Sequence, residues 1–95
     1  MIIELPSMVA GRALADALVD RLDGDLAGAV VVLDCRHLVT GSPSFAARVV
    51  ARVLGGGAAE LRVDAAPAAF VADLRDAAGR LGAADRLVVR QAAAA

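Results

Sequence analysis

The run 29-AVVVL-33 is apolar at every position. A strand with one face in water alternates apolar and polar residues, so an unbroken run is typical of a strand buried on both faces. Such strands occur mainly in parallel sheets that helices cover. A chain of 95 residues has room for one domain. The run therefore predicts a helix-covered, mostly parallel sheet.

Short apolar segments recur along the rest of the chain, and turn residues separate them. Residues 2-IIEL-5 are β-branched and apolar, and Pro6 follows them. In 60-ELRVD-64 apolar residues alternate with charged ones, so we expect this strand nearer an edge of the sheet. A last segment, 86-RLVVR-90, also reads as a strand.

In each of the three intervals between these segments, apolar residues recur at helical spacing, which predicts three helices. The first helix is expected to bury Leu14, Leu18 and Leu22, with Ala10 and Ala17, and to end at Asp23-Gly24. The second is expected to begin near Ser42, to bury Phe45, Val49, Val53 and Leu54, and to end at 55-GGG-57. The third is expected to begin with Pro67 in its first turn, to bury Phe70, Val71, Leu74, Ala78 and Leu81, and to end at Gly82.

The predicted fold class is α/β, with the order β-α-β-α-β-α-β. The sheet is four-stranded and mostly parallel or mixed, with helices packed on it and right-handed crossovers. Residues 1–91 are expected to form the single domain, and 92-AAAA-95 a disordered tail.

Composition and charge argue against several classes of function. The net charge is −1 and the arginines are scattered among aspartates, which argues against a nucleic-acid partner. The longest apolar run, 26-LAGAVVVL-33, is too short to span a bilayer. No signal peptide is visible, so we expect a cytoplasmic protein. One cysteine and one histidine cannot make an internal disulfide or a zinc site.

Cofactor chemistry and catalysis find little support in the sequence. No GxGxxG follows the first strand and no GxxxxGK[ST] is present, so we expect no cofactor and no metal. Cys35 and His37 follow the buried strand, where open α/β sheets tend to place ligands. A Cys/His dyad is one reading. A buried, inert Cys35 and a surface His37 are the favoured one, so no residue is assigned as catalytic. Asp34 could cap a loop, bind a cation or accept bonds from loop amides.

The segment 39-VTGSPSFAAR-48 has two readings. As a helix start, Ser42 is the N-cap, Pro43 takes the first helical position, and Phe45 packs into the core. Ser44 is then a surface residue in the first turn. Alternatively, the hydroxyl groups are there to be bound or modified by another protein.

The segment 30-VVVLDCRHLVTGSPSFAARVV-50 resembles the strand, loop and helix at the centre of STAS domains, the fold of bacterial anti-sigma factor antagonists. Their Asp-Ser-Ser-Gly motif falls on 42-SPSF-45. The chain is most similar to the divergent STAS-like domains of unknown function, which carry an SPSF-type motif. The Gly11-Arg12 pair and 60-ELRVDAAPAAFVADLRDAAGRLG-82 also fit that pattern, so the resemblance covers Ile2 to Arg90. Ser42 stands for the motif's aspartate, and Phe45 for its glycine.

The resemblance implies a non-enzymatic regulatory module that binds another protein. In antagonists, a histidine-kinase-like serine kinase that is also the anti-sigma factor phosphorylates a motif serine. That role falls on Ser44 or Ser42. The implied partner-binding residues are Asp34, His37, Thr40, Gly41, Phe45, Arg48 and Arg52. The alternative is a structural, self-associating module that forms homodimers through exposed edge strands.

Overall fold

The computed structural model describes residues 1–91 and confirms the predicted α/β class. Four strands form one sheet in the order β1-β3-β5-β6, and all of its neighbours pair in parallel. The strands are β1 (Ile2–Glu4), β3 (Val30–Asp34), β5 (Glu60–Asp64) and β6 (Leu87–Arg90). The helices are α1 (Arg12–Asp20), α2 (Pro43–Val53) and α3 (Ala68–Arg80), with a short 3₁₀ helix, η1 (Ala84–Arg86). The predicted tail, residues 92–95, lies outside the described part.

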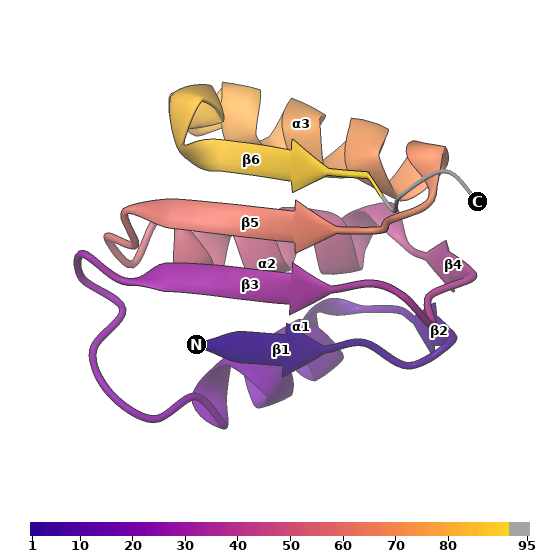
Figure 1. Ribbon diagram of the computed structural model, residues 1–95, viewed down its shortest axis with the longest axis horizontal. Coiled ribbons are helices and arrows are strands. Elements are labelled where there is room, and N and C mark those ends of the chain that lie inside the picture. Colours follow the sequence, from indigo (N-terminus) through magenta and orange to yellow (C-terminus); the bar gives the residue numbers. More distant parts are fainter. Residues whose placement is uncertain (92–95) are drawn as a thin grey trace.

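The strand order is sequential, and this decides how the helices are arranged. Within this sheet, β3 pairs with β1, β5 with β3 and β6 with β5, so each strand pairs with the previous strand of the same sheet. Successive crossovers of one hand in one direction place their helices on the same side of the sheet. Figure 1 looks onto the other side, with the strands in front and the three helices behind them. Because the strand order never reverses, the sheet lacks the crevice at which doubly wound folds bind nucleotides.

The expectation that residues 29–33 form a strand buried on both faces of the sheet is wrong for one face. Val31 and Leu33 point towards the helices and are 0% exposed. Val30 is 41% exposed, because no helix covers its side of the sheet. Val32, on the same side as Val30, is half-buried.

The expectation that residues 60–64 lie nearer an edge is also wrong. β5 is an interior strand, paired with β3 on one side and β6 on the other. Its alternation arises from the uncovered face. Leu61 and Val63 are buried against the helices, whereas Glu60, Arg62 and Asp64 lie on the side that faces water.

Two details of the expected helix faces need correction. Ala10 precedes α1 and Ala17 is exposed, and the buried residues of this helix are Ala15 and Val19. Leu81 follows the last turn of α3 and is 45% exposed.

Two of the three expected glycine stops are confirmed, whereas α1 ends at Asp20, before the expected stop at Asp23-Gly24. α2 ends at Val53 and the three glycines follow its C-cap, with Gly57 at φ 92°. Gly82 follows the C-cap of α3 at φ 73°. Backbone with these positive φ angles favours glycine, which has no Cβ to clash.

A second, two-stranded parallel sheet was not predicted. It pairs β2 (Met8–Val9) with β4 (Thr40–Gly41). β2 leads into α1 and β4 leads into α2, so the pair holds the starts of these two helices together (Figure 1).

Candidate functional site

The start of α2 is held in place by β4 and by the core beneath it. The backbone N–H of Ser42 donates to the carbonyl of Val9 in β2, at 2.9 Å. At Gly41 a Cβ would lie 2.6 Å from two ring carbons of Phe70. Only glycine fits at this position without moving that ring. Gly41, predicted to bind a partner, therefore has a packing role here.

The Ser42 hydroxyl is the N-cap of α2 and also binds the start of α1. Its Oγ accepts hydrogen bonds from the backbone N–H groups of Phe45 and Gly11, each at 3.1 Å. A hydroxyl oxygen has two lone pairs, and both are engaged in these bonds. The Ser42 proton is therefore directed at Ser44 Oγ, 3.1 Å away. The predicted N-cap is confirmed.

Ser44 differs from Ser42 in accessibility and in its free bonding capacity. Its side chain is exposed in the first turn of α2. Ser44 Oγ accepts a hydrogen bond from the Ser42 O–H, which leaves the O–H of Ser44 and one of its lone pairs available. Of the two predicted phosphorylation candidates, Ser44 alone offers an oxygen that an incoming group can reach without breaking a helix cap.

Two exposed apolar residues beside this helix start were missed by sequence reasoning. Met8 is 65% exposed and is the strand partner of Thr40, which is also exposed. Val39, next to Thr40, is 74% exposed. We call Met8, Val39, Thr40 and Ser44 the α2-start surface. The sequence carried no signal for it, because the small sheet that presents Met8 and Val39 depends on a long-range pairing.

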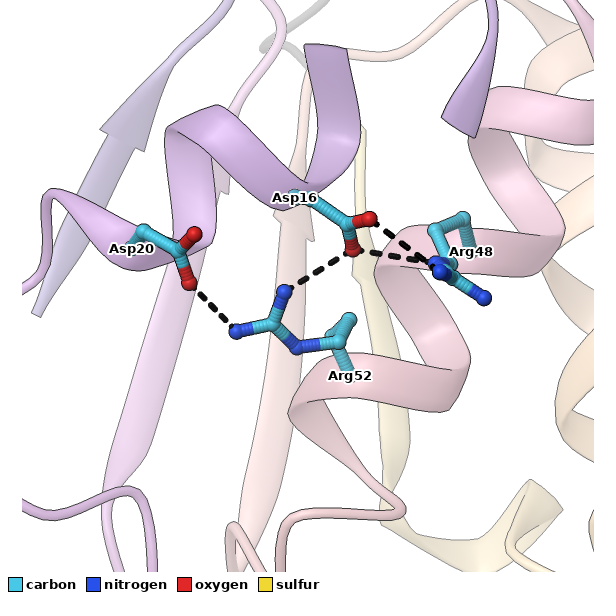
Figure 2. A network of polar contacts seen from close by, with 4 residues as sticks. All are labelled: Asp16, Asp20, Arg48 and Arg52. Carbon is cyan, nitrogen blue, oxygen red and sulfur yellow. Dashed lines mark hydrogen bonds and ion pairs between the residues drawn. The ribbon is translucent and has the colours of Figure 1, made fainter. Parts of the chain in front are cut away.

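Arg48 and Arg52, predicted to bind a partner, form ion pairs with α1 within the chain (Figure 2). Arg48 donates two hydrogen bonds to the Asp16 carboxylate, from Nε at 2.9 Å and from Nη2 at 3.1 Å. Arg52 bridges Asp16 and Asp20, with bonds of 2.8 and 2.6 Å. Hydrogen bonds from Arg48 and then Arg52 lower the pKa of Asp16. The arginines therefore join α1 to α2.

Asp34 binds within its own loop. Its carboxylate accepts the Arg36 backbone N–H at 3.1 Å and pairs with the Arg36 guanidinium at 3.0 Å. These bonds, the backbone one first, lower the pKa of Asp34. Of the roles left open for Asp34, the structure displays the bond to a loop amide. His37 is exposed in the same loop.

Cys35 is 0% exposed and has the properties of an inert core thiol. Burial raises its pKa to about 12, and the charges of Asp34 and Asp64 add to the effect. A thiolate is the nucleophilic form, so Cys35 is protonated and unreactive at neutral pH. Since His37 is exposed and Cys35 buried, the two do not form a nucleophile–base pair.

Phe45 was predicted to bind a partner, and its burial contradicts this. Its side chain is 0% exposed, and its ring centroid lies 6.2 Å from that of Phe70. Phe45 anchors α2 to α3, so it can shape the α2-start surface only by holding the helix in position.

Two open surface pockets formed by the described residues are small. One of about 210 Å³ lies between α2 and α3, and one of about 250 Å³ lies beside Asp64, Arg90 and Arg36. Small-molecule sites usually occupy roughly 300–1,000 Å³. Within residues 1–91, no group of three or more His, Cys, Asp or Glu side chains is placed to hold a metal ion. No helix in that range is long and apolar enough to cross a membrane.

No family model matches the chain, and no curated protein or solved structure matches it significantly. The similarity to STAS-like domains therefore stays a prediction from the quoted motifs.

Proposed function

We propose that the chain is a non-enzymatic regulatory protein–protein interaction module of the anti-sigma factor antagonist type, switched by phosphorylation of Ser44. One observation carries the proposal: the exposed Ser44 hydroxyl lies in the first turn of α2, and the short segment just before this helix contains exposed Val39 and pairs with exposed Met8. The start of α2 thus offers a modifiable hydroxyl, and the segment that leads into it offers exposed apolar side chains.

The electrostatics at Ser44 favour an added phosphate. The first turn of α2 has no acidic residue, so a phosphate there meets no like charge in that turn. The positive end of the helix dipole also stabilises negative charge within the first turn. Phosphorylation at Ser44 therefore leaves the domain folded and changes only what can dock on it.

The α2-start surface gives the switch its direction. A partner that covers Met8 and Val39 buries apolar area around Ser44. A phosphate placed in such an apolar contact must lose its water, which opposes binding. The unmodified form therefore binds the partner, and the phosphorylated form is released. Arg48 and Arg52 support the surface by fixing α2 against α1.

The partner that fits this scheme is a histidine-kinase-like serine kinase that also acts as an anti-sigma factor. Such a kinase supplies the ATP, so the module itself needs no nucleotide site. In this proposal the module and its kinase partner both act in the cytoplasm.

The test is to isolate the protein from its native host and map phosphate on Ser42 and Ser44 by mass spectrometry. We expect phosphate on Ser44 and none on Ser42. A pull-down with the Ser44→Glu variant should recover the partner at least tenfold less than with the unmodified chain. Ala72→Glu adds the same negative charge at an exposed position of α3 and is the matched control.

Two results would overturn the proposal. One is unmodified Ser44 under several growth conditions. The other is a partner that binds Ser44→Glu, Met8→Glu and the unmodified chain equally well.

A further inference from the structure

We propose that the uncovered face of the four-stranded sheet is a self-association surface on which a second copy of the chain packs face to face. The inference is independent of the proposed function, because it concerns the side of the sheet away from α2 (Figure 1). We call this surface the open face. It consists of Ile2, Glu4, Val30, Val32, Asp34, Glu60, Arg62, Asp64, Val88 and Arg90.

The open face carries apolar side chains that are exposed to water. Ile2 is 64%, Val30 41% and Val88 36% exposed. Parallel sheets are almost always covered on both faces, and their strands then read as unbroken apolar runs. Here β3 has such a run, and yet one of its faces is bare. A second layer that covers Val30 and Val32 resolves this mismatch between sequence and structure.

The open face also carries a row of charged residues that crosses all four strands. Glu4, Asp34, Asp64 and Arg90 lie side by side in one row of strand partners. Glu4 is on the edge strand β1 and Arg90 on the opposite edge strand, β6. Neither makes an ion pair with another described residue. The face therefore has an unpaired Glu4 at one edge and an unpaired Arg90 at the other, with Asp64, which also makes no ion pair among the described residues, next to Arg90.

This distribution is complementary to itself under a two-fold axis parallel to the strands. The axis places β1 of one copy over β6 of the other, and it keeps each row opposite the same row. Glu4 then faces Arg90 of the second copy, and the pair occurs twice. In the next row, Ile2 faces Val88 of the second copy.

The middle of the charged row brings two carboxylates together at two places, which weakens this packing. Asp34 faces Asp64 of the second copy, and the charge of Asp34 is already balanced by Arg36. Asp64 Oδ1 is buried and has no hydrogen-bond partner among the described residues. Arg62, in the apolar row, is paired with Glu60 at 3.0 Å.

The size of the open face sets the strength of the association. With about 4.8 Å between strands and about 3.3 Å per residue, four strands of up to five residues cover roughly 300 Å². Stable interfaces bury about 800 Å² on each partner. We therefore expect a weak, transient dimer that forms as the concentration rises.

Sedimentation equilibrium of the full chain from about 10 µM to 1 mM tests the proposal. We expect reversible dimerisation, which Val30→Asp abolishes. Glu4→Arg and Arg90→Glu should each weaken it at least fivefold. An equal mixture of the two variants should regain dimers, because both edge contacts then pair opposite charges. Arg75→Glu, a charge reversal on the exposed side of α3, is the matched control and should leave the Kd unchanged.

Thermal melting followed by circular dichroism checks that each variant is folded. A chain that stays monomeric at 1 mM would overturn the proposal. So would dimers that persist in Val30→Asp, since they would use another surface, such as a strand edge or the groove between α2 and α3. Failure of the charge-swapped mixture to associate would contradict the two-fold arrangement. None of these outcomes depends on whether Ser44 is phosphorylated.

Discussion

Ser42 and Ser44 show how two identical residues in one turn acquire different roles. The local pattern Ser-Pro-Ser already favours Ser42 as the N-cap, because the residue before the first helical position takes that role. The bond from the Gly11 N–H to Ser42 Oγ adds a contact 31 residues away in the sequence. One hydroxyl thus supports the starts of two helices, and the other stays available to solvent.

We expect Ser42→Ala to destabilise the fold by about 1–3 kcal/mol, because the N–H groups of Phe45 and Gly11 lose their acceptor. Ser44→Ala should cost less than about 0.5 kcal/mol, since it removes an exposed hydroxyl. Urea denaturation of both variants measures the difference. Equal losses would contradict the double cap.

At the scale of elements, α1 and α2 are joined by charge as well as by packing. Asp16 of α1 binds both arginines of α2, and Asp20 binds Arg52 (Figure 2). A lowered folded pKa means that the ionised carboxylate of Asp16 favours the folded state. This contribution is complete above the ordinary pKa of 3.8, and it is lost as the pH falls through the lowered folded value.

We expect Asp16→Asn to be less stable than the unmodified chain at pH 6, and the gap to narrow as the pH falls below about 4. Urea unfolding midpoints at pH 6 and pH 3 measure the two gaps. Asp76→Asn is the control, because it makes the same change in an exposed pair within α3. A gap that is the same at both pH values would mean that the carboxylate charge does not join α1 to α2.

As a whole, the protein has two layers, a sheet and three helices, and the helices bury one side of the sheet. Its apolar core lies between the sheet and the three helices. The sheet contributes Val31, Leu33, Leu61 and Val63 to this core, each 0% exposed. Neighbouring residues of one strand therefore differ sharply in what they contribute to stability.

We expect Val31→Ala to cost about 1.5–3 kcal/mol, since it leaves a cavity in the core. Val30→Ala should cost less than about 1 kcal/mol at protein concentrations below 10 µM, because Val30 is already 41% exposed. Chemical denaturation at a fixed low concentration compares the two. A loss at Val30 that matches the loss at Val31 would mean that something covers the open face of the monomer.

Patterns that span a few residues predicted much of the fold and part of the site. The apolar periods predicted the four main strands and three helices, and the glycine stops and the Ser42 cap followed from local backbone preferences. Contacts between distant segments escaped prediction. The β2–β4 pair and the exposure of Met8 and Val39 depend on segments more than 30 residues apart.

Local patterns in the sequence account for the order and type of the main elements, because hydrophobic period and capping act within a few residues of the chain. The tertiary structure decided which face each element shows to its neighbours. In the folded chain Phe45 is buried, Arg48 and Arg52 form ion pairs with α1, and Val30 is exposed to water. A run of apolar residues favours burial, but it does not determine which part of the structure covers those residues. In this chain helices cover one face of the sheet, and the sequential strand order leaves the other face open.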